Sequence, residues 1–161
     1  AFDMLSDLLS SGRSSRFVQH LVQDKQIFNS IDAYISGSID NGLFHIVGKP
    51  APEKTLEEAE KAIWEELALL TEGSIDENEL EKVKNRYESE QIFNNLNYLN
   101  VATNLAYFEL IGKAEDINTE VKKYRSVTQE QIKRAAKQTF LPENCSVLYY
   151  KAAAKGASHT P

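Results

Sequence analysis

The sequence predicts an α+β fold in which helices pack mainly on one face of a small antiparallel or mixed β-sheet. Two adjacent strands are expected at 27–35 and 43–47, with the turn-forming residues SIDNG between them, and a distant third strand at 145–150. Helical periodicity fills most of the remainder, so the expected order is α-α-β-β-α-α-α-α-α-β. Three strands make a thin sheet for so many helices, which indicates that a first strand is missing upstream of Ala1.

Two helices are expected before the first strand. Residues 2–10 carry apolar side chains at helical spacing, and Gly12 ends that helix. Ser14 or Ser15 is expected to cap a second helix that has its own apolar stripe. The apolar period then changes to two, which predicts that one face of the first strand consists of Ile27, Asn29, Ile31, Ala33 and Ile35.

The later helices are marked by their first and last residues. A Thr or Asp followed three residues later by Glu or Gln is typical of a capping box. Three such pairs occur, namely Thr55 with Glu58, Asp76 with Glu79, and Thr128 with Gln131. Gly73, Gly112 and Pro142 are expected to end helices, an Asn-rich stretch near 94–100 to interrupt one, and a short helix to occupy about 115–124.

Length and composition indicate one globular domain at 1–151, followed by a disordered tail or linker at 152–161. Acidic residues (24) outnumber basic ones (18) and no basic stripe stands out, which argues against a nucleic-acid partner. No apolar run approaches the roughly 20 residues that span a bilayer. We therefore expect a soluble protein, of bacterial periplasm or cytoplasm, and the chain reads as a fragment of a longer one because it opens without Met inside a helical element.

A metal site within this chain is not expected. His20 and Asp24 are four residues apart and would share a helix face, but two ligands fall short of the roughly three that a catalytic zinc needs. His45 alternates with apolar residues in a strand, and His159 lies in the tail. No two histidines are close enough for H-E-x-x-H or H-x-x-E-H, so the expected metal ligands are none.

Nucleophilic catalysis is not expected either. Cys145 opens a predicted strand in an apolar setting, which favours a buried, inert thiol. The serines around Gly12 in SSGRSS could form an anion-binding loop, but a helix stop followed by a helix cap explains them better. The Glu- and Lys-rich runs at 53–66 and 76–90 read as solvated helix faces. The expected catalytic residues are therefore none.

Several stretches in order nevertheless resemble one family. LLSSGRSSRFVQHLVQDKQIFNSIDAYIS followed by GLFHIVGKP, then IDENELEKVKNRYESE, LAYFELIG and VTQEQIKRAAKQTFLPENCSVLYY, is similar to the insulinase/pitrilysin family of zinc metallopeptidases, in its processing-peptidase-like branch. The resemblance covers residues 1 to about 151. It implies the non-catalytic C-terminal domain, a half-repeat of the metallopeptidase fold that lacks its first strand here.

The resemblance also implies a site and partners. Non-catalytic domains of this family often carry an Arg and a Tyr, seven residues apart, that grip substrate; the corresponding positions here are Val22 and Asn29, which do not match. The implied partners are the catalytic domain, in the same chain or a partner subunit and in a dimer, and a peptide substrate. Zinc is implied only in that catalytic domain, with no cofactor in this chain. An inactive, structural or assembly-core homologue is the alternative.

Overall fold

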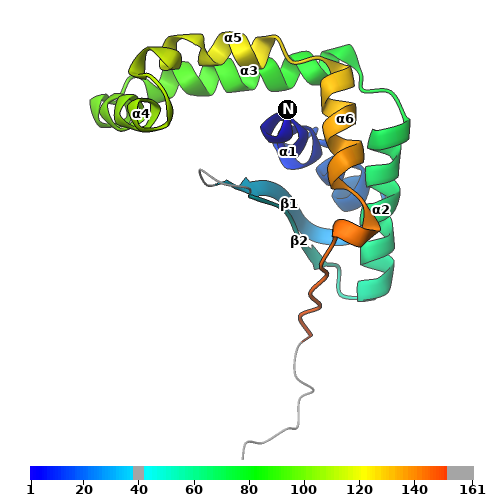
Figure 1. Ribbon diagram of the computed structural model, residues 1–161. Coiled ribbons are helices and arrows are strands. Elements are labelled where there is room, and N and C mark those ends of the chain that lie inside the picture. The colour runs from blue at the N-terminus through cyan, green and yellow to red at the C-terminus, as the bar shows by residue number, and fades with distance from the viewer. Residues whose placement is uncertain (38–41, 152–161) are drawn as a thin grey trace, which may run out of the picture.

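The sheet is an antiparallel pair of strands, β1 (Phe28–Ser36) and β2 (Leu43–Pro50), in a computed structural model that describes residues 1–37 and 42–151. The predicted pairing of two adjacent antiparallel strands is confirmed, although residues 38–41 of the expected turn lie outside the described residues. Helix α1 (Phe2–Ser10) packs on one side of the sheet, and Figure 1 shows no described helix on the opposite side. The α+β class with helices mainly on one face is therefore confirmed.

An irregularity in β1 changes the predicted register of side chains. Phe28 pairs with Pro50 and Ser30 with Lys49, so Asn29 has no regular partner. A bulge of this kind shifts the alternation by one residue. As a result Phe28 is buried and Asn29 is exposed, the reverse of the prediction, whereas Ile31 and Ala33 face the core as expected.

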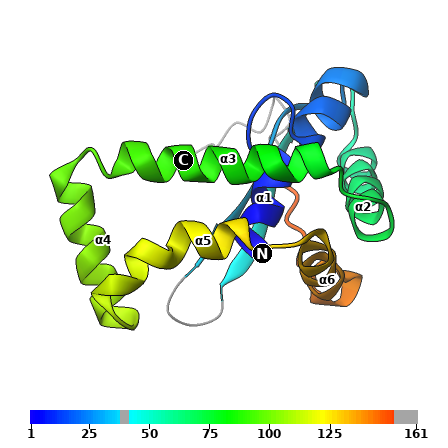
Figure 2. The same cartoon turned by 90° about the horizontal axis from the view of Figure 1, so that it is seen from above.

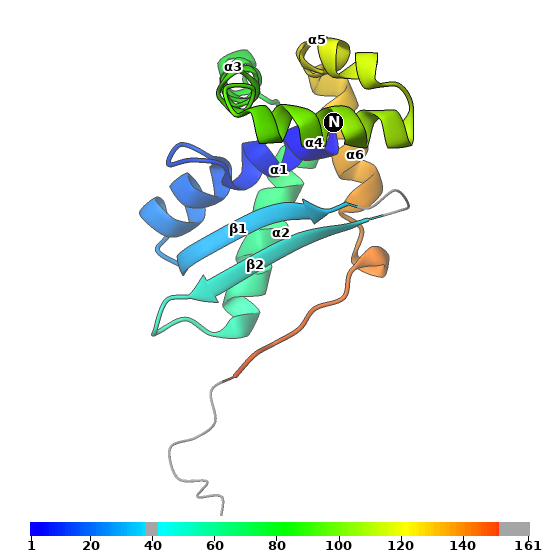
Figure 3. The same cartoon turned by 90° about the vertical axis from the view of Figure 1, so that its left-hand side faces the viewer.

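The side of the sheet away from α1 is only partly apolar. Residues that oppose each other across two strands point to the same face. Tyr34 opposes His45, Ser36 opposes Leu43, and Ser30 opposes Lys49. The ring of Tyr34 stacks on that of His45 at 4.9 Å between centroids, and Ser36 Oγ lies 2.7 Å from His45 Nε2. Asp32 likewise opposes Val47. We call this surface the open face and define it by Ser30, Asp32, Tyr34, Ser36, Leu43, His45, Val47 and Lys49. Figure 3 shows the two strands that carry it.

The core lies between α1, the sheet and two long-range neighbours, α2 (Leu56–Glu72) and α6 (Gln129–Thr139). A π-helix, η1 (Phe17–Asp24), joins α1 to β1 and adds to the same cluster. Fully or almost fully buried apolar side chains include Met4, Leu5, Leu8, Leu9, Phe17, Leu21, Leu70, Ile132 and Ala136. Each such Leu, Met or Phe contributes roughly 1.5–3 kcal/mol when it is removed from water.

The remaining helices form an arm that extends away from this core. Helix α3 (Glu77–Asn94) runs beside α5 (Glu120–Arg125), and α4 (Tyr98–Ile111) with the 3₁₀-helix η2 (Ala114–Thr119) joins their far ends (Figure 2). Tyr87 and Tyr124 stack at 3.4 Å between ring centroids, and Arg125 bonds to α3. Helix α4 has no buried residue.

Two of the three predicted capping boxes are confirmed. The Thr55 hydroxyl accepts from Glu58 N at 3.1 Å while the Glu58 carboxylate accepts from Thr55 N, and Thr128 and Gln131 repeat this at the start of α6. Asp76 does cap α3, accepting from Asn78 N at 2.7 Å, but Glu79 bonds to Arg16 instead. The start of the second helix, η1, differs from the prediction. Ser15 Oγ donates to Gly12 O, so Ser15 does not cap η1.

The predicted strand at 145–150 is wrong for the described residues. The segment after the short helix η3 (Pro142–Asn144) is exposed and pairs with no described strand, so the sheet has two strands rather than three. Its Tyr149 hydroxyl donates to Glu60 of α2. Cys145 is consequently exposed and not buried as predicted. The expected strand before Ala1 stays a prediction, and the expected tail at 152–161 and His159 lie outside the described residues.

Candidate functional site

The junction between η1 and β1 holds both residues at which the sequence predicts a departure from the family pattern. The helix ends with wide turns, in which Lys25 N donates to His20 O at 3.0 Å and Ile27 N donates to Leu21 O at 2.8 Å. Gln26 takes a positive φ of 50°, which reverses the chain into β1. A strained non-glycine residue at this point fixes the direction in which the strand leaves the helix.

Val22 and Asn29 stand on either side of this reversal. Val22 is half-buried and packs against the core, so its side chain contributes to stability. Asn29 is exposed at the irregular position of β1. A valine offers no hydrogen-bond donor and an asparagine carries no charge, so these two side chains cannot hold a peptide backbone as an Arg and a Tyr would.

His20 lies on η1 and bonds to a residue far away in the sequence. Its Nδ1 is 2.9 Å from Glu66 Oε1 on α2. The Glu66 side chain is 1% exposed and that of His20 is 41% exposed. The second oxygen, Glu66 Oε2, is buried and has no hydrogen-bond partner among the described residues. The pair therefore gives two ligand atoms from two residues, fewer than a catalytic zinc requires.

A bidentate ion pair joins the start of η1 to α3. Arg16 Nε lies 2.8 Å from Glu79 Oε1, and Arg16 Nη2 lies 2.9 Å from Glu79 Oε2 and 3.2 Å from Ser74 O. Burial disfavours the charged guanidinium, but its hydrogen bonds and its attraction to Glu79 outweigh this and raise the pKa of Arg16. Arg16 Nε and Nη2 both donate to protein groups, which suits a structural clamp between η1 and α3.

The residues near the start of α3 are likewise engaged with each other. Lys82 Nζ donates to Ser14 Oγ at 2.8 Å and to Ser14 O at 3.2 Å. Ser14 and Ser15 therefore bond within the loop and its neighbours. Gly12 follows the end of α1, as the helix-stop part of the SSGRSS interpretation predicts, but the predicted serine cap of the next helix does not form.

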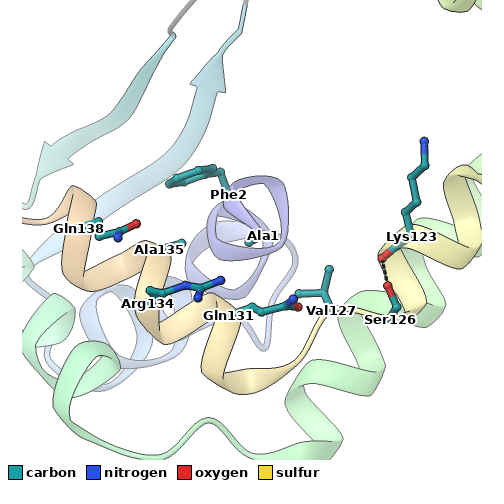
Figure 4. Close-up of a pocket in the computed structure, with 9 residues that line it drawn as sticks. All are labelled: Ala1, Phe2, Lys123, Ser126, Val127, Gln131, Arg134, Ala135 and Gln138. Atoms are coloured by element: carbon teal, nitrogen blue, oxygen red, sulfur yellow. Dashed lines mark hydrogen bonds between the residues drawn. The ribbon is translucent and has the colours of Figure 1, made fainter. Parts of the chain in front are cut away.

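A hollow of about 310 Å³ lies between α1, α6 and the chain that joins α5 to α6 (Figure 4). Lys123 and Arg134 are the charged side chains along it, and Ser126 Oγ donates to Lys123 O. The lining offers neither a nucleophile with a base nor a carboxylate pair. We therefore assign it no chemistry.

Within residues 1–37 and 42–151, no group of three or more His, Cys, Asp or Glu side chains could hold a metal ion. The same part of the chain contains no helix whose length and apolar character would let it cross a membrane. Glu66 is the buried polar residue that sequence reasoning missed. It occupies a helical position in line with Ala59, Ala62 and Leu70, all buried, and an acid on such a stripe signals a buried partner.

Comparison with known proteins agrees with this absence of catalytic machinery. The model of the peptidase M16 inactive domain matches residues 1–87. No curated protein sequence matches the chain.

Three solved structures share the fold. A protease from Helicobacter pylori is 24% identical with a TM-score of 0.77 over 87% of this chain, which spans 34% of that protein. A provisionally assigned zinc protease from Bordetella pertussis Tohama I is 17% identical, with a TM-score of 0.75 over 89% of this chain and 79% of the other. The inactive peptidase domain of a provisionally assigned zinc protease from Bordetella parapertussis is also 17% identical, with a TM-score of 0.75 over 88% and 77% of the two chains. The family match extends over more than half of the sequence, and the chain belongs to the peptidase M16 inactive-domain family as a non-catalytic domain.

Proposed function

We propose that this chain is the non-catalytic half of a zinc metallopeptidase of the processing-peptidase type, in which it forms one wall of a peptide-binding chamber and docks on the catalytic domain. The single observation that carries the proposal is the match to the inactive peptidase domain in a chain whose described residues assemble no metal site. Zinc does not fit the donors present here, so the bond-breaking chemistry belongs to the partner domain.

The open face of the sheet is the surface that suits a chamber wall. No helix among the described residues covers it, and it combines an aromatic–imidazole stack with serine hydroxyls and apolar side chains. Such a surface offers apolar contact and hydrogen bonding to extended peptides of varied sequence. Val22 and Asn29 stand where relatives have the Arg and Tyr that bind the substrate backbone. This chain would therefore contribute shape and contact area, and the partner would supply the hydrogen bonds to the peptide backbone.

The proposal is tested by mixing this chain with the zinc-motif domain of its own protease and assaying peptide hydrolysis with and without a chelator. We expect no hydrolysis by this chain alone, no stoichiometric zinc binding to it in calorimetry, and chelator-sensitive cleavage by the mixture. One zinc per chain at micromolar affinity, or a mixture without chelator-sensitive activity, would refute it.

Substitutions on the open face test the chamber wall separately. Tyr34→Ala should raise the KM of the assembled enzyme severalfold, because the stack with His45 is lost from the peptide-facing surface. Tyr150→Ala removes an exposed tyrosine outside that face and should leave KM unchanged. Equal KM values for the two variants would contradict the assignment of the open face.

The structural alternative, an assembly-core homologue without activity, is favoured by one observation, the absence of Arg and Tyr at positions 22 and 29. Asn29→Tyr combined with Val22→Arg restores both side chains. A lower KM for the double variant supports a position beside bound peptide, whereas a mixture without chelator-sensitive cleavage, with either the double variant or the unsubstituted chain, supports the assembly role.

A further inference from the structure

The outer edge of β1, on the side away from β2, is covered by two side chains. Ser10 Oγ, at the end of α1, lies 2.8 Å from Asp32 Oδ1 and 3.0 Å from Ala33 O. Its single proton can serve either acceptor, and in both cases the hydroxyl group covers the Ala33 carbonyl. The same Asp32 oxygen accepts from Ala33 N at 2.9 Å. We call Ser10 and Asp32 the edge cap, because they engage both backbone groups of Ala33.

The edge cap lies on the backbone groups that a further strand would need. Along an antiparallel strand, residues whose N–H and C=O bond to the partner alternate with residues whose groups point away from it. The groups of Ala33 bond to the edge cap and not to β2, so those of Ile31 and Ile35 also point outward. Ala33 is the middle one of these three positions, and an added strand could not bond to it while the edge cap is in place.

Strand β1 has no other protection of the usual kind. An edge strand is a template for pairing with another chain, and proteins block such edges with charged side chains, with Pro or with a short strand. Strand β1 is nine residues long, contains no Pro, Lys or Arg, and has Asp32 as its single charged residue. The described part of the chain places no strand beyond it. Protection of this edge therefore depends on Asp32 and on the serine that holds it.

The sequence of β1 shows which strand would fit an uncovered edge. A two-fold axis at Ala33 places Ala33 opposite its own copy and Ile31 opposite Ile35, so apolar residues meet on the core side. Asp32 would oppose Tyr34, so the two-fold axis sets no like charges directly opposite each other. The two alanines would exchange both N–H···O bonds, as a hydrogen-bonded pair does. The edge is thus complementary to itself, and a second copy of this chain is the strand that it suits.

We propose that the edge cap is an autoinhibitory contact that closes β1 to antiparallel pairing with a second copy of this chain. Ser10 holds the Asp32 carboxylate over the edge, and that carboxylate takes the Ala33 N–H that the second copy would otherwise engage. The proposal concerns the edge of the sheet. It is independent of the proposed function, which places peptide on the open face.

The test compares Ser10→Ala combined with Asp32→Ala, which removes the edge cap, with Ser6→Ala combined with Asp24→Ala as the matched control. Each double variant loses one helical serine hydroxyl and one exposed carboxylate, so their net charges are equal. Asp32 is exposed and Ser10 is half-buried, so both proteins should fold, as circular dichroism and urea unfolding will verify. Sedimentation velocity over a range of protein concentrations gives the dimer dissociation constant of each.

We expect the variant without the edge cap to dimerise at least about tenfold more tightly than the unsubstituted chain, and the control to stay within about twofold of it. Any pairing through β2 is common to all these proteins and cancels in the comparison. Ile35→Pro in the variant without the edge cap removes an outward N–H, and should return dimerisation to the level of the unsubstituted chain. Asp32→Asn alone keeps the Oδ1 acceptor and should leave dimerisation unchanged.

Three results would overturn the proposal. The first is equal dimerisation of the variant without the edge cap and the control. The second is a gain in dimerisation that survives Ile35→Pro, because the contact then lies away from the edge of β1. The third is a gain with Asp32→Asn as large as that of the double variant, because the charge of Asp32, and not its hydrogen bonds, would then keep two copies apart. None of these results depends on peptidase activity.

Discussion

His20 Nδ1 lies 2.9 Å from Glu66 Oε1, across 46 residues of sequence, and joins η1 to α2 at the edge of the core. The carboxyl group is buried and its other oxygen has no partner in the described part of the chain. A polar group in that situation depends strongly on the one hydrogen bond it has. The histidine that could be taken for a metal ligand therefore satisfies a buried acid.

His20→Ala should lower the free energy of unfolding by about 1–3 kcal/mol, because it leaves the Glu66 carboxyl group without its hydrogen bond. Urea unfolding followed by circular dichroism measures the change. Gln19→Ala, at the exposed neighbouring position, should cost less than about 0.5 kcal/mol. Similar losses in the two variants would show that the pair does not stabilise the fold.

Gly48→Ala should destabilise the chain by about 1–3 kcal/mol, since a methyl group there would collide with the ring of Phe28 in the core. Gly37→Ala is the matched control, because a methyl group at that position meets nothing within 4 Å. Thermal unfolding of both variants gives the comparison. A Gly48→Ala protein as stable as Gly37→Ala would mean that Phe28 has room to move.

Three tyrosines have a raised pKa in the folded chain, and the two with the largest shifts, Tyr87 and Tyr124, should titrate last. Burial, with the nearby Glu120 and Asp3 carboxylates, raises the pKa of Tyr87 from 10.0 to about 12. Burial and the hydrogen bond that it donates to Asp3 Oδ2 at 2.6 Å raise the pKa of Tyr124 further. Absorbance at alkaline pH should show these two ionising after the others, and Tyr124→Phe should remove one of them.

The same shifts fix the sign of a stability change. Above pH 10 the unfolded chain loses phenolic protons that folded Tyr87 keeps until about pH 12, so the free energy of unfolding falls as pH rises through this window. Below pH 10 these groups are protonated in both states and contribute no slope. The free energy of unfolding should fall more steeply between pH 10 and 12 in the unsubstituted chain than in Tyr124→Phe. Equal slopes in the two proteins would contradict the assigned burial.

Arg125→Gln should loosen the arm without unfolding the core. Arg125 Nη1 lies 3.0 Å from Glu81 Oε2, Nε lies 2.9 Å from Glu88 Oε2, and Nη2 lies 2.7 Å from Asn85 Oδ1, so one side chain holds α5 to three turns of α3. Hydrogen exchange in α4, η2 and α5 should accelerate, with exchange in α1 unchanged. Equal acceleration in both regions would indicate a global effect.

Helix ends and the hairpin could be predicted from the sequence because their signals are local. The Thr55–Glu58 and Thr128–Gln131 pairs are three residues apart, and both form the expected boxes. The Asn-rich break between α3 and α4 also occurs where composition places it. Local hydrogen-bond chemistry decides these points without help from distant residues.

Errors arose where a distant residue competes for a local partner. Glu79 bonds to Arg16, 63 residues away, instead of completing its expected capping box, and no local signal predicts the bond between His20 and Glu66. The bulge at Asn29 reverses the faces of two residues, and no periodicity in the sequence announces it. Of the two predicted site positions, the structure gives Val22 a packing role and leaves Asn29 exposed, and their relation to a peptide stays a prediction.

The placement of α6 has a consequence for how the chain folds during synthesis. Ile132 and Ala136 are fully buried against elements made from the first seventy residues, α1 and α2. Until Ile132 and Ala136 leave the ribosome, the side of α1 that packs against α6 stays exposed, and it can bind chaperones or aggregate. Completion of the core therefore depends on α6, and a chain stopped before residue 130 would be a substrate for quality control rather than a smaller domain.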